Sequence, residues 1–88
     1  MGVYKLCWKE SVRKDFRRLP SKIVSRVIKE VESLPANPIP IDSEKLRDTE
    51  HTYRLRVGDY RIIYQINPLD KEIVVCRVRH RKDVYREN

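Results

Sequence analysis

The sequence predicts a small α+β domain in which two helices pack on one face of an antiparallel sheet. Two observations lead to this class. Apolar residues recur every three or four positions in the first half of the chain, the period of a helix, and every second position from Thr52 onward, the period of a strand. The 88 residues suffice for one hydrophobic core, so we expect residues 1–88 to form a single domain.

The first half of the chain predicts one strand and two helices. Residues 3–8 are rich in strand-forming side chains. Ser11 stands where a helix N-cap is expected, and Pro20 ends the helix that follows it. Ser21 offers an N-cap for a second helix, which ends at the proline-rich residues 35–40. The apolar stripe of this second helix consists of Val24, Val27, Ile28, Val31 and Leu34.

The second half predicts three strands joined as an antiparallel meander. Residues 41–50 are expected to form a surface connection that leads into it. Gly58 and Asp59 form a two-residue hairpin turn, because glycine adopts positive φ without a steric cost. Residues 67–70 form the second turn, and residues 72–79 form the third strand. We expect the core face of this third strand to carry Val74, Cys76 and Val78.

The first turn fixes which residues of the hairpin face each other. A two-residue loop pairs Val57 with Tyr60, Arg56 with Arg61, Leu55 with Ile62, Arg54 with Ile63 and Tyr53 with Tyr64. The tyrosines and aliphatic residues Tyr53, Leu55, Val57, Tyr60, Ile62 and Tyr64 then share the face that the helices cover. The opposite face carries Arg54, Arg56 and Arg61.

Two arginines directly opposite each other call for an explanation. Like charges at Arg56 and Arg61 destabilise pairing by about 0.2–1 kcal/mol. A bound polyanion would offset that cost, since guanidinium groups fork onto phosphate oxygens. The alternative is that the arginines occupy the wet face of a half-covered sheet, where alternation places polar residues anyway. We favour the anion site, because a face of mixed charge would be less costly.

The third strand extends this basic face. Arg77, Arg79 and Arg81 share one parity, so we expect them to project together and to bind RNA phosphates. Tyr85 lies just past the strand and adds an aromatic ring of the kind on which single-stranded RNA stacks its bases. His80 lies between two of these arginines, and its alternatives are an RNA-contacting base or a structural residue at the strand end.

The overall charge favours a polyanionic partner. The chain has 20 Lys and Arg against 13 Asp and Glu, a formal charge of +7. Nucleic acid, an anionic membrane surface and an acidic protein all fit this excess, and a basic solvated surface without a partner is the alternative. The sequence has no signal-peptide core and no stretch long enough to span a membrane, so we expect a cytoplasmic protein.

No motif for a metal or a cofactor appears in the sequence. Cys7 and Cys76 lack the spacing of zinc ligands and are expected to be small buried side chains. There is also no carboxylate cluster for a metal and no glycine-rich phosphate loop. RNA cleavage needs neither, because the 2′-hydroxyl of the substrate is itself the nucleophile. The protein then has to orient it, stabilise the charge at phosphorus and move protons.

Two segments of the chain resemble the RelE/ParE toxin superfamily, and they resemble its RelE branch more than its ParE branch. They are residues 53–64, YRLRVGDYRIIY, and residues 78–85, VRHRKDVY. The two predicted helices and the proline-rich break also fit, so the resemblance covers almost the whole chain. It implies a RelE-like fold, similar to that of the microbial ribonucleases, and the toxin of a type II toxin–antitoxin system. The partner that it implies is an acidic RelB-like antitoxin, bound in a hetero-oligomer.

The same resemblance implies an enzyme, a metal-independent endoribonuclease that cuts messenger RNA in the ribosomal A site. The 2′-hydroxyl attacks the neighbouring phosphate, which leaves a 5′-hydroxyl on the downstream fragment. By carry-over from the family, Arg61 and Arg81 hold the phosphate and Arg81 protonates the leaving oxygen. Tyr85 orients the substrate or its base.

The resemblance leaves the general base open. Well-studied members carry lysines at the positions of Arg54 and Arg56, and arginine effectively cannot lose its proton. The base is then His80, Tyr85 or a group on the ribosome. Two other functions are also open: a ParE-like inhibitor of DNA gyrase, and a catalytically weak homologue that binds RNA or docks an antitoxin. The arginines at positions 54, 56, 61 and 81 favour the nuclease, because an inhibitor needs no phosphate cage.

Overall fold

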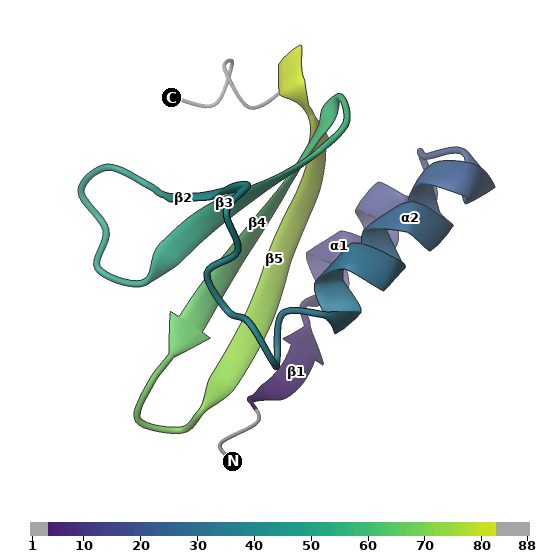
Figure 1. Cartoon of the computed structure of the whole chain (residues 1–88). Helices are drawn as coiled ribbons and strands as arrows, with labels where there is room; N and C mark the ends of the chain where they lie inside the picture. The colour runs from purple at the N-terminus through teal and green to yellow at the C-terminus, as the bar shows by residue number, and fades with distance from the viewer. Residues whose placement is uncertain (1–3, 83–88) are drawn as a thin grey trace.

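One five-stranded sheet and two helices make up the chain in the computed structural model, which describes residues 4–82. The helices lie side by side against one face of the sheet, as Figure 1 shows. In chain order the elements are β1 (Lys5–Trp8), α1 (Glu10–Phe16), α2 (Ser21–Glu32), β2 (Ser43–Lys45), β3 (Thr52–Val57), β4 (Tyr60–Asn67) and β5 (Glu72–His80). The expected α+β class and the helices on one face are confirmed.

The sheet is mixed, whereas the sequence predicted an antiparallel one. Its strand order is β1-β5-β4-β3-β2. The meander β3-β4-β5 is antiparallel, as expected, but β1 pairs with β5 in parallel, with Lys5 opposite Glu72 and Trp8 opposite Val75. The reason is the path of the chain: the helices carry it across one face after β1, and the last strand of the meander returns beside β1 in the same direction.

The surface connection expected over residues 41–50 contains a short strand, β2. It pairs antiparallel with β3 and places Ser43 opposite Leu55 and Glu44 opposite Arg54. Three polar residues show no hydrophobic alternation, so a periodicity argument has nothing to detect there. Pairing with β3, a contact between distant parts of the chain, makes this segment a strand.

Both helices begin earlier than the sequence predicted. The N-cap of α1 is Lys9 rather than Ser11, and the N-cap of α2 is Pro20 rather than Ser21; neither makes a side-chain capping bond. The hydroxyl of Ser11 instead donates to the main-chain oxygen of Cys76 on β5, at 2.6 Å. The two helices are therefore fixed mainly by what they contact in the sheet and not by local caps.

The core lies between the helices and the sheet, and the predicted hairpin register is confirmed. Val57 is opposite Tyr60 and Arg56 is opposite Arg61, with Gly58 in the turn at a φ of 60°. The Tyr64 hydroxyl, in a side chain with no exposed surface, donates to the oxygen of Pro38 at 2.7 Å. The buried apolar residues are Val12, Val27, Val31, Leu34, Leu55, Val57, Ile62, Tyr64, Ile66, Ile73, Val75 and Val78.

A β-bulge in β5 changes which residues of that strand face the core. Ile63 of β4 is opposite Arg77, but the next residue, Tyr64, is opposite Val75, so Cys76 is an extra residue between two paired ones. Ile73 and Val75 face the core before the bulge, and Val78 faces it after the bulge. The expectation that Val74 and Cys76 share a core face with Val78 is therefore wrong, because the extra residue reverses the alternation.

Candidate active site

The outer face of the hairpin carries a hollow that gathers the three arginines expected there. Arg54, Arg56 and Arg61 line it together with Asp42 and Glu44, and its volume is about 250 Å³. Both acidic residues come from β2 and the turn before it, a segment that the sequence left as a connection. The strand register therefore brings the predicted guanidinium groups together, and β2 with the turn before it adds two carboxylates.

Each arginine of this hollow has its own setting. Arg54 forms an ion pair with Glu44 at 3.4 Å. The Nη1 atom of Arg61 donates to the main-chain oxygens of Gly58, at 3.1 Å, and Tyr60, at 3.0 Å. Arg56 is exposed directly opposite Arg61. The ion pair of Glu44 thus neutralises the charge of Arg54, and the bonds to carbonyl oxygens fix the Arg61 guanidinium beside the hairpin turn.

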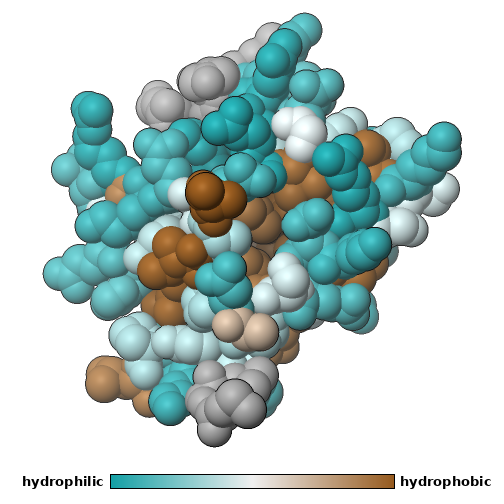
Figure 2. Space-filling view, viewed as in Figure 1, coloured by the Kyte–Doolittle hydropathy of each residue, from teal (hydrophilic) through white to brown (hydrophobic). Residues whose placement is uncertain are grey.

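Arg81 lies at the same end of the sheet. It follows β5 directly, and its main-chain N–H donates to the oxygen of Asp59 in the hairpin turn at 2.8 Å. Its side chain is exposed. Tyr85, the other residue that the resemblance placed at this site, lies outside the described residues. In the space-filling view, hydrophilic side chains cover this upper end of the molecule, while hydrophobic ones gather in the middle of the face (Figure 2).

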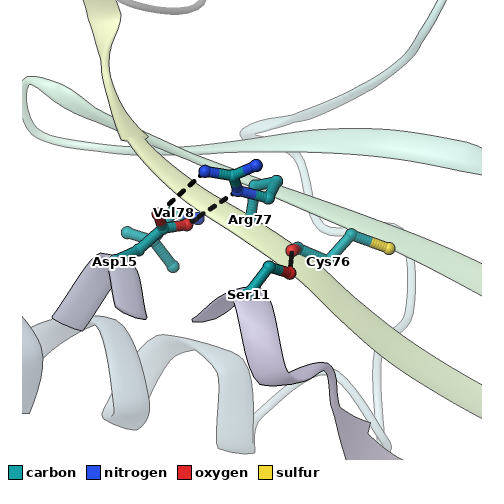
Figure 3. A network of polar contacts seen from close by, with 5 residues as sticks. All are labelled: Ser11, Asp15, Cys76, Arg77 and Val78. Atoms are coloured by element: carbon teal, nitrogen blue, oxygen red, sulfur yellow. Dashed lines mark hydrogen bonds and ion pairs between the residues drawn. The ribbon is translucent and has the colours of Figure 1, made fainter. Parts of the chain in front are cut away.

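Arg77 shares its strand parity with Arg79, as expected, since the two residues are opposite Ile63 and Arg61 of β4. The Arg77 side chain is nevertheless held by α1. Its guanidinium group binds Asp15 of α1 through two bonds, Nε to Oδ2 and Nη2 to Oδ1, both at 3.0 Å (Figure 3). Asp15 is only 7% exposed and also accepts the main-chain N–H of Val78 at 2.9 Å. A sequence signal existed for this residue: Asp15 is three positions after Val12, on the buried side of α1.

Together, Ser11 and Asp15 clamp β5 at its bulge. The two residues are one helical turn apart on α1 and hold Cys76, Arg77 and Val78 through the contacts above. The bulge determines which way the remaining residues of β5 point. The clamp therefore fixes the part of the strand that leads to Arg79, His80 and Arg81.

Arg79 and His80, the last two predicted site residues of β5, lie outside the arginine hollow. Arg79 is opposite Arg61, and His80 is opposite Tyr60. The rings of His80 and Tyr60 meet edge to face, 5.3 Å apart at 86°. Both β5 residues line a second hollow, next to α1, and neither lines the hollow of Arg54, Arg56 and Arg61. The structure thus separates His80, a candidate general base, from the arginines that it was expected to join.

The remaining chemistry of the described residues is limited. Cys7 and Cys76 are free and half-buried rather than fully buried. Burial raises the pKa of the Cys76 thiol, although the nearby Lys9 charge partly opposes this. Within residues 4–82, no three His, Cys, Asp or Glu side chains gather into a group that could hold a metal ion. Over the same residues, neither helix has the length and apolar character needed to cross a membrane.

Comparison with known proteins agrees with the fold. Residues 6–85 match the family described as the ParE toxin of type II toxin–antitoxin system, parDE. The chain is 30% identical to Toxin RelG of Mycobacterium tuberculosis, covering 94% of this chain and 97% of the relative. It is 33% identical to Toxin RelE3 of Methanocaldococcus jannaschii, covering 92% and 94% of the two chains.

A solved structure extends this likeness to three dimensions. The crystal structure of the archaeal RelE–RelB complex from Pyrococcus horikoshii contains a chain that matches with a TM-score of 0.79 and 32% identity, over 90% of this chain and 96% of that one. The family model spans most of the sequence, and the relatives carry RelE-type names. The chain therefore belongs to the RelE/ParE family of toxins of type II toxin–antitoxin systems, on its RelE-type branch.

Proposed function

We propose that this toxin is a ribosome-dependent endoribonuclease that cuts messenger RNA in the ribosomal A site. The observation that carries the proposal is the hollow on the hairpin, where Arg54, Arg56 and Arg61 meet beside the tethered main chain of Arg81. Guanidinium groups fixed before the reaction stabilise charge as it develops on a phosphate without having to reorganise. A toxin that acts only by binding a protein has no need for such a set of groups.

The reaction is a transesterification within the RNA. The 2′-hydroxyl oxygen forms a bond to the adjacent phosphorus, and the bond from phosphorus to the 5′ oxygen breaks. The products are a 2′,3′-cyclic phosphate upstream and a 5′-hydroxyl downstream. Arg61 and Arg81 hold the phosphate oxygens. The leaving 5′ oxygen takes up a proton from water, because a guanidinium group effectively cannot lose its own.

The proton of the 2′-hydroxyl needs an acceptor, and the hollow suggests one that the sequence did not. Asp42 and Glu44 are the acidic groups of its lining, whereas arginines do not accept protons. We assign the uptake of the proton to these carboxylates, ahead of His80, which lines the other hollow. Tyr85 keeps the role in orienting substrate that the resemblance gives it.

A second part of the proposal concerns the partner. The Pyrococcus horikoshii relative was solved as a RelE–RelB complex, and this chain carries a formal charge of +7. We propose that an acidic RelB-like antitoxin binds this chain in a hetero-oligomer and covers or distorts the arginine hollow. Covering is needed because a free cytoplasmic protein would present that surface to every RNA.

The test is a cleavage assay on ribosomes programmed with a defined message. Arg61→Ala and Arg81→Ala should each lower the rate about a hundred- to thousandfold, the usual cost of losing one fixed donor to a developing oxyanion. Glu44→Gln should lower it while leaving RNA binding intact. The matched control is Arg17→Ala, which removes the same charge from the exposed C-cap of α1 and should have little effect.

Two outcomes would contradict the proposal. Equal losses in Arg61→Ala, Arg81→Ala and Arg17→Ala would mean that bulk charge, and not a phosphate site, drives activity. Full activity in both Arg61→Ala and Arg81→Ala, with folding verified by circular dichroism, would reject the assignment of the site.

A further inference from the structure

A second hollow lies between the end of α1, the first residue of β4 and the end of β5. Its volume is about 360 Å³, at the small end of the about 300–1,000 Å³ usual for ligand pockets. The polar and aromatic part of its lining consists of Asp15, Arg18, Tyr60, Arg77, Arg79 and His80. Two of these residues, Asp15 and Arg77, belong to the clamp that fixes β5 (Figure 3).

The lining of this hollow is positively charged. It contains three arginines and one carboxylate, Asp15. The Arg77 guanidinium donates to both oxygens of that carboxylate, and the main-chain N–H of Val78 donates a further hydrogen bond to one of them. The hydrogen bonds of this carboxylate are therefore made within the protein, and the lining as a whole favours an anion.

The lining also offers aromatic surface. The edge-to-face contact between Tyr60 and His80 leaves ring surface at the hollow, and neither residue is fully buried. Aromatic side chains beside arginines are the usual platform for an unpaired base, and an acidic peptide would make no use of them. The combination of positive charge and rings therefore favours a nucleotide over a stretch of carboxylates.

The two hollows are neighbours across the edge of the sheet. Tyr60 and Arg61 are consecutive residues of β4 that line different hollows, and Arg79 is opposite Arg61. β1 pairs with β5 only as far as Val75, so among the described strands the end of β5 has a partner on one side alone. A nucleic acid strand can therefore pass from one hollow to the other over this edge.

We propose that the hollow beside α1 binds the phosphate and base of an RNA nucleotide that flanks the cleaved one. The RNA strand then crosses the end of β5, with the reacting phosphate in the arginine hollow and the flanking nucleotide against Arg18, Tyr60 and His80. This inference rests on the proposed function, because it takes RNA as the substrate.

The test compares two neighbouring arginines of α1. Arg18 lines the hollow and Arg17 does not, although both are exposed and carry the same charge. The probe is a fluorescent 12-nucleotide 2′-O-methyl RNA, which lacks the nucleophile and stays uncut. Arg18→Ala should raise its dissociation constant about five- to tenfold, against less than twofold for Arg17→Ala. It should also lower the slope of log affinity against log salt by about 0.7, one phosphate contact on a single strand.

Equal effects of the two variants on RNA binding would overturn the inference. So would a loss that appears only with poly-glutamate as the probe, because that would make the hollow a site for acidic peptide. Cleavage by the wild-type toxin on programmed ribosomes is scored separately. If the wild type cleaves but Arg18→Ala has no selective effect on RNA binding, the nucleotide site in this hollow is refuted and the proposed function stands. If Arg18→Ala has a selective effect but the wild type does not cleave, the proposed function is refuted and the RNA-binding hollow stands.

Discussion

Asp15 shows how one buried side chain determines where distant arginines lie. Its carboxylate binds the Arg77 guanidinium and the N–H of Val78, and this fixes the strand at the residues that precede Arg79 and Arg81. Its position on the inner face of α1 was readable from the helical period. Its partner was not, because the pairing depends on a bulge that brings Arg77 toward the helix.

We expect Asp15→Ala to lower the free energy of unfolding by about 1.5–3 kcal/mol, because it leaves the Arg77 guanidinium and the buried N–H of Val78 without their acceptor. Arg77→Ala should cost at least as much, since it leaves the carboxylate of Asp15, a side chain only 8% exposed, without its cation, whereas the Arg77 side chain is 39% exposed and can reach solvent. Urea unfolding of both variants and of the double variant closes a double-mutant cycle. We expect the double variant to lose clearly less stability than the two single variants lose together; simple additivity would show that the two residues are not coupled.

Two weakly acidic side chains make the stability of the fold depend on pH in the alkaline range. Burial raises the pKa of the Cys76 thiol and of the Tyr64 hydroxyl above their ordinary values of 9.0 and 10.0. In the unfolded chain these groups lose their protons at the ordinary values, before the folded protein does. Ionisation therefore favours the unfolded state, and stability present below about pH 9 is lost as the pH rises through this range.

The variant that tests this effect is Cys76→Ala. Urea unfolding from about pH 8 to pH 10 should show a shallower loss of stability for the variant than for the wild type, because one of the two titrating groups is gone. A loss of equal steepness in both proteins would show that the thiol does not contribute.

At the scale of elements, the hairpin was predictable and its neighbours were not. Alternation of apolar residues and the Gly58–Asp59 turn are local signals, and they gave the register of β3 and β4 correctly. β2 carries no local signal because Ser43, Glu44 and Lys45 are all polar. The bulge in β5 is equally silent, since Val74, Val75 and Cys76 form a continuous apolar run that fits either face.

The hairpin turn depends on a residue that tolerates a left-handed backbone. Gly58 has a φ of 60°, and a Cβ atom there would lie 3.2 Å from Nη1 of Arg26 on α2. Gly58→Ala should therefore cost about 1–2 kcal/mol, mostly from backbone strain because the arginine end can move. Gly58→Asn should cost less, since asparagine adopts this conformation more readily. Thermal unfolding that shows Gly58→Ala to be as stable as Gly58→Asn, or more stable, would contradict this view of the turn.

At the scale of the whole molecule, sequence reasoning located the arginine hollow but not the second one. Arg54, Arg56 and Arg61 lie on one strand pair, so parity alone places them together. The hollow beside α1 combines side chains from α1, β4 and β5, and only the packed structure shows that Arg18 and His80 face the same space. A site built by one hairpin can be predicted from local sequence, and a site built across layers cannot.

The partner proposal is tested on the intact complex. We expect that co-expression with a RelB-like antitoxin gives a soluble complex whose ribosome-dependent cleavage is at least tenfold slower than that of the free toxin. The physical reason is competition, because an acidic chain that covers or distorts the arginine hollow displaces phosphate. A complex that cleaves as fast as the free protein would show that the antitoxin leaves this surface open.

Cleavage of messenger RNA by attack of the 2′-hydroxyl, as proposed for this toxin, is best tested by the chemical ends of the products. The wild-type toxin is incubated with a message on programmed ribosomes, with the same message without ribosomes, and with a message carrying one 2′-deoxy nucleotide at the cut site. We expect a downstream fragment with a 5′-hydroxyl and an upstream 2′,3′-cyclic phosphate, formed only on ribosomes and absent from the deoxy message. Fragments with a 5′-phosphate, cleavage of the deoxy message, or an uncut message beside inhibited DNA gyrase would contradict it.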